Sequence, residues 1–541
     1  MTARQGKFAV LEQLQADGLT TMFGNPGTVE QGLLDAIEQS PGLQYVLALQ
    51  ETVAIAAADG YARASGGAAV VQLHSGVGLG NGIGMLYQAM RGHSPLVVLA
   101  GEAGVRYEAL DAQMATDLVR MAEPVTKYAT RVTHPDSLLR VLRRAVKIAL
   151  TPPRGPVFVA LPMDVLDAHT GEPVVPSTVP SRAVRPVDAE LDRAAAALRG
   201  ARRPLVLMGD GVAVSGAQDE LARVAEALGA DVYGVNDSEL NMDARNPRYR
   251  GQLGHMFGAT SDAVVAGADA VLIVGTYVFP EVFPSTSSPF APGARIVHID
   301  LNDYEIAKNH PVDVALVADP KPTLAALADR LGAPAGPPTV TWTPPPLTGG
   351  SPLIEHFSAA LAATTGDELI LVDEALTASP GLISHLPPHR PGSYFLTRGG
   401  SLGIGLPGAI GAKLARPDAT VVGVSGDGGS MYTIQALWTA ARYGVNAKFV
   451  IANNLRYELL DANLERYWQD NGTVPRRHPD GFDLTRPEIG FTDLARGLGV
   501  EALRVDEADQ VSPAVRKMIE HQGPFLLDLD TSGGGRRDRA A

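Results

Sequence analysis

The 541-residue chain contains no cysteine. It therefore has no disulfides, no thiolate metal site and no cysteine nucleophile. Long apolar runs are also missing, since no stretch approaches the roughly 18 continuous apolar residues that suggest a membrane-spanning helix. The first residues lack the apolar segment and cleavage site of a signal peptide. We therefore expect a soluble, cytoplasmic protein.

Basic residues are fewer than acidic residues in this chain. The chain has 45 Lys and Arg against 59 Asp and Glu, which gives a net charge of −14 and a sequence pI of about 5.4. A protein of this charge is repelled by phosphate backbones and anionic lipid. We therefore expect neither nucleic acid nor a membrane as its partner.

Glycine and proline are plentiful, at 58 and 40 residues. Proline concentrates in one segment that ends near Asp188 and in another at 332–352, where it removes backbone donors and disfavours helix. Both segments resemble linkers. They divide the chain into domains at 1–180, 189–331 and 353–530, a number that fits about 150 residues per domain.

Each of the three blocks alternates short β-rich runs with helical segments. The runs are YVLAL, AAVVQL, LVVLAG and VFVALP in the first block, PLVLMG, DAVLIVG and RIVHID in the second, and LILVDE, TVVGVSG, AKFVIANN and FLLDLD in the third. Nearly continuous apolar strands separated by helices indicate parallel sheets covered on both faces. The sequence thus predicts three doubly wound α/β domains.

The outer blocks also resemble each other. Residues 60–76 and 411–427 each read as a helix end, a turn, an apolar strand and a glycine-rich loop, followed by a further helix and strand. Any two doubly wound domains share some of this pattern. The matching order and spacing favour duplication.

The strongest local motif places Asp427 after one apolar strand and Asn453 and Asn454 after the next. Ligands of open parallel sheets gather at the carboxyl ends of the strands. A carboxylate and an amide oxygen brought together by a βαβ unit suit Mg²⁺. The alternative is that Asp427 caps a helix and the asparagines form a turn, but the paired spacing favours a metal site.

The residues after Asp427 suit a phosphate. Gly428 and Gly429 let the backbone approach an anion, and a helix expected to begin near Tyr432 directs its positive end toward it. These features predict a metal–phosphate site and leave the cofactor open.

These motifs resemble the signature of thiamine-diphosphate enzymes, in the branch of the decarboxylases and acetolactate synthases. Within that branch the similarity is greatest to the benzoylformate decarboxylases. It rests on FGNPGT at 23–28, ALQETVAIAAADGYARAS at 48–65, QLHSGVGLGN at 72–81, HSPLVV at 93–98, GSLGIGLPGAIG at 400–411 and the run from 426 to 454. The resemblance spans nearly the whole chain. It implies a pyrimidine-binding domain, a middle domain and a diphosphate-binding domain, in that order.

The resemblance implies thiamine diphosphate and Mg²⁺ as cofactors. It places the metal ligands at Asp427, Asn454 and the carbonyl of Arg456. The cofactor contacts that it implies are Asn25, Pro26, Glu51, Thr377, Gly400, Leu402, Gly428, Gly429, Ser430 and Tyr457.

Glu51 follows an apolar run and begins a helix. On its own it could be a carboxylate favoured by the helix dipole. The resemblance makes it the glutamate that binds the aminopyrimidine ring and promotes deprotonation of the thiazolium carbon. A partly desolvated carboxylate suits such proton transfer.

Gly400 and Leu402 resemble the loop under the thiazolium, in which a carbonyl accepts from the 4′-amino group and a bulky residue bends the cofactor. Leu402 could instead belong to the core. Gly403, Gly405 and Gly408 also satisfy G-x-G-x-x-G. Because no strand precedes them and the asparagine pair would stay unexplained, a dinucleotide site is disfavoured.

His74 ends an apolar strand. It is either a structural histidine or, by the resemblance, an active-site group that helps proton transfer. Thr28 stands where the benzoylformate decarboxylases have a serine that contacts the substrate carboxylate. By resemblance, both are candidate catalytic residues together with Glu51.

Several positions depart from the benzoylformate decarboxylases. Val282 stands where a second histidine is expected. Asn463 replaces an aromatic wall, although Leu459 and Leu460 stay apolar. Arg398, in place of a small residue, either holds an acidic group of the substrate or pairs at the surface.

The resemblance implies a carbon–carbon lyase that decarboxylates a 2-oxo acid. The alternatives are an acetolactate-synthase-like carboligase and an inert protein that keeps the fold for binding. In the family each cofactor lies between two subunits, so a homodimer is the minimum and a homotetramer is expected. Some relatives bind FAD or ADP in the middle domain, and no specific motif for either is found here.

Overall fold

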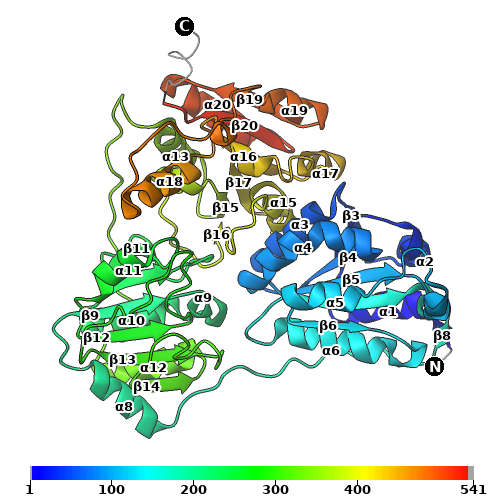
Figure 1. Cartoon of the computed structure of the whole chain (residues 1–541), viewed down its shortest axis with the longest axis horizontal. Coiled ribbons are helices and arrows are strands. Elements are labelled where there is room, and N and C mark those ends of the chain that lie inside the picture. Colours follow the sequence, from blue (N-terminus) through cyan, green and yellow to red (C-terminus); the bar gives the residue numbers. More distant parts are fainter. Residues whose placement is uncertain (1–2, 534–541) are drawn as a thin grey trace. The chain divides into compact units, whose positions relative to one another are not determined.

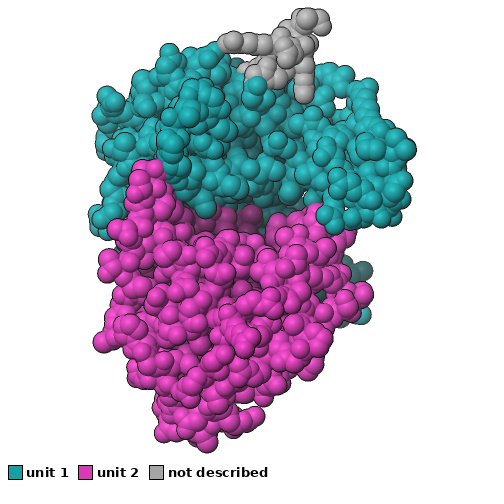
Figure 2. All heavy atoms as spheres, turned by 90° about the vertical axis from the view of Figure 1, so that its left-hand side faces the viewer, with its two compact units in different colours: residues 1–179, 345–386, 399–541 teal, residues 180–344, 387–398 magenta. Residues whose placement is uncertain are grey.

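The computed structural model describes residues 3–533 and contains three six-stranded parallel sheets (Figure 1). The chain forms two compact units, coloured separately in Figure 2. One comprises residues 1–179, 345–386 and 399–541, and the other residues 180–344 and 387–398. The segments between Thr170 and Asp188 and between Leu331 and Leu353, where proline is frequent, contain no helix or strand.

The first sheet has the order β3-β2-β4-β5-β7-β6. Its strands are β2 (Thr21–Gly24), β3 (Gln44–Leu47), β4 (Ala69–His74), β5 (Leu96–Glu102), β6 (Tyr128–Arg131) and β7 (Val157–Pro162). Its helices are α1 (Gly6–Ala16), α2 (Gln31–Glu38), α3 (Glu51–Ser65), α4 (Ser75–Arg91), α5 (Leu118–Ala122), α6 (Leu138–Leu150) and α7 (Met163–Asp167). A short antiparallel pair joins β1 (Arg4–Gln5) to β8 (His169–Thr170).

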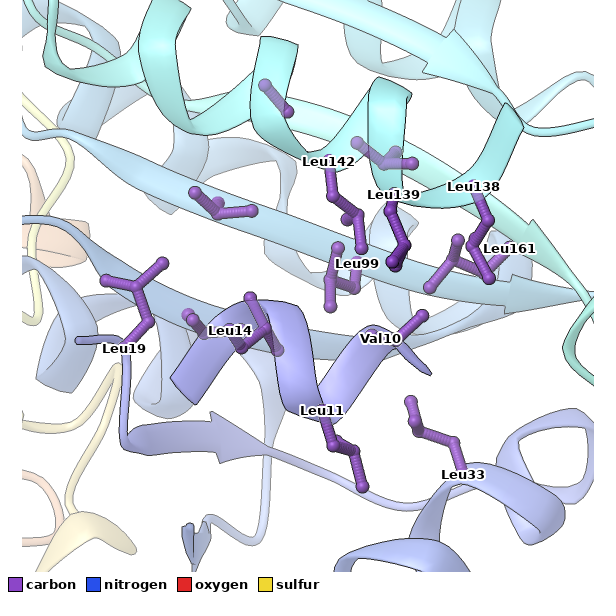
Figure 3. Close-up of a cluster of buried hydrophobic side chains, with 14 of the residues drawn as sticks. Val10, Leu11, Leu14, Leu19, Leu33, Leu99, Leu138, Leu139, Leu142 and Leu161 are labelled. Atoms are coloured by element: carbon purple, nitrogen blue, oxygen red, sulfur yellow. The ribbon is translucent and has the colours of Figure 1, made fainter. Parts of the chain in front are cut away.

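Helices α1 and α6 cover one face of this sheet and enclose a buried apolar cluster (Figure 3). Val10 and Leu14 in α1 are spaced by one helical turn, so they point to the same side, and Leu138 and Leu142 repeat this spacing in α6. All four are fully buried. The apolar spacing of these helices therefore fixes which of their faces meets the sheet.

The third sheet has the order β16-β15-β17-β18-β20-β19. Its strands are β15 (Leu369–Glu374), β16 (Tyr394–Leu396), β17 (Thr420–Gly426), β18 (Ala447–Asn453), β19 (Glu501–Val505) and β20 (Phe525–Asp530). The helices here are α13 (Leu353–Thr364), α14 (Ser379–Leu382), α15 (Gly405–Ala415), α16 (Asp427–Ser430), α17 (Ala436–Arg442), α18 (Glu458–Asp470), α19 (Phe491–Gly497) and α20 (Ala508–Glu520). In both outer sheets the strands stand in the order second, first, third, fourth, sixth, fifth, as two copies of one unit would.

Helices α3 and α15 occupy equivalent places in the two outer sheets and lie against each other (Figure 1). A Cβ at Gly60 would lie 2.1 Å from the carbonyl oxygen of Gly408, and one at Gly411 would lie 1.8 Å from that of Ala57. Only glycine allows such an approach. The domains of the first unit are thus joined backbone against backbone.

The second unit holds the middle sheet, whose order is β11-β10-β9-β12-β13-β14. Its strands are β9 (Pro204–Met208), β10 (Asp231–Val235), β11 (Tyr249–Leu253), β12 (Ala270–Val274), β13 (Arg295–Asp300) and β14 (Val314–Val317). Its helices are α8 (Asp188–Leu198), α9 (Gly211–Ser215), α10 (Gln218–Leu228), α11 (Gly258–Val265) and α12 (Pro320–Leu331). At the reversal of strand order the loops after β9 and β12 are bonded to each other, Gly211 N donating to Gly275 O at 3.0 Å.

The architecture confirms the predicted class of three doubly wound parallel-sheet domains. Among the helices of residues 3–533, none combines the length and the apolar composition needed to span a bilayer.

Candidate active site

Glu51 is the first residue of α3 and is 7% exposed. The cap of this helix is Gln50, whose side-chain oxygen accepts from the amides of Thr52 and Val53 at 2.5 and 3.3 Å. The Glu51 carboxylate is therefore not needed as a cap. Its Oε2 accepts from Asn81 Nδ2 at 3.0 Å.

Glu51 and His74 meet across Gly78 in α4. A Cβ at Gly78 would lie 3.0 Å from Glu51 Oε1 and 3.4 Å from the Cβ of His74. The missing side chain leaves room for both. The structure thus brings together two of the predicted catalytic residues.

Thr28 lies in the loop that approaches this pair. It begins a short 3-10 helix, Thr28–Glu30, and is exposed. Asn25 anchors the loop by donating from Nδ2 to the carbonyl of Ala48 at 2.8 Å, while Pro26 is exposed. The helix ends at Glu30, whose Oε2 lies 2.8 Å from His74 Nδ1. Glu30 was not predicted.

Asp427 and Asn454 lie at the carboxyl ends of the neighbouring parallel strands β17 and β18, which are in register from Val421 with Ala447 to Gly426 with Ala452. The Arg456 amide donates to Asp427 Oδ2 at 3.2 Å and to Asn454 Oδ1 at 3.1 Å. Two oxygen atoms that converge on one nitrogen lie close enough to share one cation.

The chemistry of these donors fits Mg²⁺, which favours carboxylate, amide and carbonyl oxygens. Burial raises the pKa of Asp427 to about 6. A buried carboxylate is costly unless its charge is paired, so a cation beside Asp427 would stabilise the ionised form. Within residues 3–533, no group of three or more His, Cys, Asp and Glu side chains could hold a metal ion. A cation here therefore depends on the amide of Asn454 and on backbone carbonyls.

The backbone around Asp427 is closely packed. A Cβ at Gly428 would lie 2.2 Å from the ring of Tyr457, and one at Gly429 would lie 3.2 Å from Ser425 Oγ. Ser430 Oγ donates to the carbonyl of Asp427 at 2.8 Å. Gly428 is thus required because the tyrosine ring occupies the space of a side chain.

The prediction of a helix that begins near Tyr432 is wrong. Helix α16 starts at Asp427 itself and ends at Ser430, and α17 starts only at Ala436. Between them the amides of Tyr432, Thr433 and Ala436 bond three residues back. Successive tight turns here replace the i to i−4 bonds of an α-helix.

Thr377 and Asn454 are joined through Glu458, the first residue of α18. Glu458 Oε2 accepts from Thr377 Oγ1 at 2.8 Å and from Asn454 Nδ2 at 2.9 Å. On the same helix Leu459 and Asn463 are half-buried and Leu460 is exposed. The start of helix α18 therefore links the predicted metal ligand Asn454 to the predicted cofactor contact Thr377.

The loop that holds Gly400 and Leu402 is fixed by a buried carboxylate that was not predicted. Glu374, at the end of β15, accepts from the amides of Gly403, Ile404 and Gly405 at 2.5, 3.2 and 2.9 Å. Gly400 has a φ of +80°, which favours glycine. Leu402 is half-buried and does not belong to the described core.

Glu374 also removes the dinucleotide alternative. The amides of the G-x-G-x-x-G segment, which a phosphate would need, already bind a carboxylate. The glycines instead serve packing, since Gly408 approaches Gly60.

Arg398 is 9% exposed and pairs with Asp210, with 2.6 Å between Nη1 and Oδ2. Of the two alternatives for Arg398, a pair at the surface is excluded, because both partners are buried. The charge of Arg398 is thus matched within the second unit. Val282, in the same unit, is 59% exposed.

The site residues form two clusters: Asn25, Pro26, Thr28, Glu51 and His74 on the first sheet, and Thr377, Gly400, Leu402, Asp427, Gly428, Gly429, Ser430, Asn454, Arg456 and Tyr457 on the third. Within residues 3–533, no described hydrogen bond or ion pair joins a member of one cluster to a member of the other. The two clusters are therefore not linked directly in the described hydrogen-bond network of residues 3–533.

Family models match the chain from end to end. The N-terminal TPP binding domain of thiamine pyrophosphate enzymes matches residues 4–121, the central domain 191–327 and the C-terminal TPP binding domain 379–529. The benzoylformate decarboxylase of Pseudomonas aeruginosa is 32% identical over 530 residues, which cover 97% of this chain and 98% of that protein. The chain belongs to the thiamine pyrophosphate enzyme family.

Acetolactate synthases and benzoylformate decarboxylases are both similar to the chain. The acetolactate synthase of Arthrospira platensis is 28% identical, covering 97% of this chain and 93% of that protein. The thiamine diphosphate-dependent 4-hydroxybenzoylformate decarboxylase of Rhodococcus jostii RHA1 has a TM-score of 0.87 at 30% identity, covering 98% of this chain and 99% of that one. The three sheets correspond to the three domains of the family.

Proposed function

We propose that the protein is a thiamine-diphosphate- and Mg²⁺-dependent decarboxylase of a 2-oxo acid. The observation that carries the proposal is the position of His74 beside Glu51 at Gly78. Release of an aldehyde requires a proton on the substrate-derived carbon, whereas a carboligase joins that carbon to a second carbonyl compound. His74 is placed to supply a proton beside Glu51.

The third-sheet cluster binds the cofactor in this proposal. Asp427, Asn454 and the Arg456 carbonyl would hold Mg²⁺, which would supply positive charge for the diphosphate. Gly428 lets the Tyr457 ring pack directly against the backbone beside Asp427, and Glu374 fixes the loop of Gly400 and Leu402. Rigid support of this kind keeps reacting groups in position.

The first-sheet cluster moves protons. Glu51 exchanges a proton with the aminopyrimidine, and Asn81 orients its carboxylate. When bound, thiamine diphosphate would supply a nucleophilic carbon and an electron sink for the loss of CO₂. His74 delivers the proton that completes the aldehyde, and Thr28 donates to the substrate carboxylate.

The test is to incubate the loaded enzyme with pyruvate, benzoylformate, 4-hydroxybenzoylformate and branched 2-oxo acids, and to measure CO₂ and the organic product. We expect one equivalent of aldehyde per CO₂ with at least one substrate. An acyloin as the sole product would reject the proposal.

The second candidate is an acetolactate-synthase-like carboligase. It is favoured by Val282, which stands where the benzoylformate decarboxylases have a histidine, and by the similarity to acetolactate synthases. A third candidate, an inert protein that retains the fold, predicts no turnover on any 2-oxo acid. A calorimetric titration with thiamine diphosphate and Mg²⁺ tests the third, because binding without turnover would support it.

The quaternary structure belongs to the same proposal. We infer a homodimer as the minimum active unit and a homotetramer as its complete form. The lack of a described bond between the first-sheet and third-sheet clusters of residues 3–533 supports this inference. In this proposal each cluster is a half-site, completed by the complementary cluster of another copy.

A further inference from the structure

Glu30 is a buried carboxylate that has no role in the proposed function. Its side chain is 1% exposed. Oε2 lies 2.8 Å from Nδ1 of His74, and within residues 3–533 its other oxygen, Oε1, accepts no hydrogen bond. Burying a carboxylate costs more free energy than burying an apolar side chain of the same size, so packing alone does not explain a glutamate here.

The surroundings of Glu30 favour its pairing with His74 alone. Burial raises the pKa of Glu30, and the hydrogen bond and charge of His74 oppose the rise. Tyr45 stands nearby, but its hydroxyl donates to Gln72 Oε1 at 2.6 Å and its pKa is raised by burial, so it stays neutral. Among these groups, His74 alone can supply a positive charge.

Two glycines leave room for this arrangement. A Cβ at Gly27 would lie 1.9 Å from Nδ1 of His74, so the imidazole ring occupies the place of a side chain there. A Cβ at Gly101 would lie 2.3 Å from Oε1 of Glu30. The ring and the carboxylate are thus confined between β4, β5 and the loop that begins at Gly27.

The geometry points to a defined orientation of His74. Nδ1 faces Glu30, and the Cβ of His74 borders Gly78 together with Glu51. A carboxylate at Nδ1 stabilises the tautomer that carries its proton on Nδ1, which leaves Nε2 as the exchanging nitrogen. The same carboxylate stabilises the imidazolium, as in other histidine–carboxylate pairs.

We propose that Glu30 is a positioning residue that fixes the tautomer and orientation of His74, so that Nε2 carries the proton delivered to the product. This inference rests on the proposed function of His74. In the step, Nε2–H loses its proton to the substrate-derived carbon, and His74 regains one from water. Glu30 keeps its contact with Nδ1 throughout and transfers no proton to the substrate.

The first test compares Glu30→Gln with Glu30→Asp. Gln keeps the size of the side chain but removes the charge, and we expect kcat to fall by about 10- to 100-fold with KM changed less than threefold. Asp should restore part of the loss. Glu102→Gln is the matched control, because Glu102 is a buried carboxylate at the end of β5 that pairs with Arg131. It should lower the melting temperature without this kcat loss.

A double-mutant cycle with His74→Ala separates positioning from general destabilisation. If Glu30 acts through His74, Glu30→Gln should cost little in the His74→Ala background. Fully additive losses would overturn the proposal, as would wild-type kcat in Glu30→Gln.

A spectroscopic readout does not depend on turnover. In protein with ¹⁵N-labelled histidine, assigned with the His74→Gln variant, neutral His74 should carry its proton on Nδ1, and Glu30→Gln should give a mixture of tautomers. An Nε2–H tautomer in the wild type would overturn the proposal. If the tautomer is as expected but no 2-oxo acid is decarboxylated, the proposed function fails and the pairing stands.

Discussion

Glu51 is the residue on which the proposed chemistry depends most directly. Because Gln50 caps α3, Glu51→Gln should leave the helix intact, and thiamine diphosphate should still bind. We expect kcat to fall by about 10²- to 10⁴-fold, the usual contribution of a general acid–base group. Steady-state kinetics and a cofactor titration measure both quantities. Glu38→Gln, an exposed change on α2, is the control, and an equal loss in both variants would remove Glu51 from the mechanism.

Glu374 tests whether the loop of Gly400 and Leu402 needs its buried support. In Glu374→Gln the amide group would turn donors toward the donors of Gly403, Ile404 and Gly405, and each unpaired amide costs about 1–3 kcal/mol. We expect a lower melting temperature and at least a tenfold higher Kd for thiamine diphosphate.

The matched change is Glu368→Gln, at the exposed residue just before the same strand, β15. It should leave both quantities unchanged. Unaltered cofactor affinity in Glu374→Gln would mean that the loop holds its shape by itself.

Glu30 and Glu374 show where prediction from the sequence stops at this scale. Asp427 and Asn454 were predicted because strand ends and a short spacing mark them, and the role of Glu51 was implied by the family resemblance. Glu30 precedes His74 by 44 positions and Glu374 precedes Gly403 by 29, and neither has a local motif. Their roles exist only once the sheets bring the partners together.

At the scale of the element, strand β13 carries two buried titratable side chains on one face, His298 and Asp300. Burial lowers the pKa of His298 from its ordinary 6.5 to about 4. Burial raises the pKa of Asp300 from its ordinary 3.8 to about 7. Between pH 4 and 6.5 the unfolded chain binds the extra proton at His298, whereas the native state binds it at Asp300. The two contributions to stability therefore oppose each other.

Single substitutions should expose each contribution. In Asp300→Asn the melting temperature of the middle domain should rise more steeply from pH 4 to 6.5 than in the wild type, because the opposing contribution of Asp300 is removed. In His298→Asn it should rise less, or fall, over the same range, because the contribution of His298 is removed. Calorimetry over a pH series measures both slopes. Changes of slope with the same sign in the two variants would contradict the opposed burial effects.

The pair of helices α3 and α15 tolerates no side chain where the backbones meet. We expect Gly411→Ala to lower the free energy of unfolding by about 1–3 kcal/mol or more, since the new Cβ would collide with the Ala57 carbonyl. Denaturant unfolding measures the change. Gly67→Ala, where only Ser65 Oγ lies within 4 Å, is the control. Equal stability of the two variants would show that the helices can separate without cost.

Strands were predicted unevenly, for a physical reason. The central strands β4, β5, β17 and β18 are nearly continuous apolar runs because helices cover both faces. Edge strands lack that signal. Strand β6 is half-buried throughout, and β14 alternates buried with exposed residues, so neither stands out from a loop.

For the whole molecule, the two half-sites predict complementation between inactive chains. Glu51→Gln and Asp427→Asn should each be nearly inactive alone. In a mixed dimer one site would combine both defects and the other would be intact, so co-refolded chains should regain about a quarter of wild-type activity. Activity after mixing, with each variant refolded alone as a control, measures this. No recovery would place each complete site within one chain.

The order of domains was predictable at this scale, whereas the order of strands was not. The resemblance between residues 60–76 and 411–427 matches the identical strand orders of the outer sheets. The middle sheet differs, with its first strand at the centre, and no periodicity distinguishes the two orders because both bury similar strands. In the sequence, only the proline-rich segments on either side indicate that the middle sheet belongs to a separate unit.

The contact between α3 and α15 has a consequence for synthesis on the ribosome. Helix α3 is translated early, but the glycines that it packs against emerge only after the entire middle domain. During that interval the Gly60 surface of the nascent chain has no partner, while the intervening unit can already close its own sheet. The middle domain is therefore translated completely before the first and third domains can pack against each other. The rate of translation through residues 180–344 sets how long α3 lacks its contact with α15.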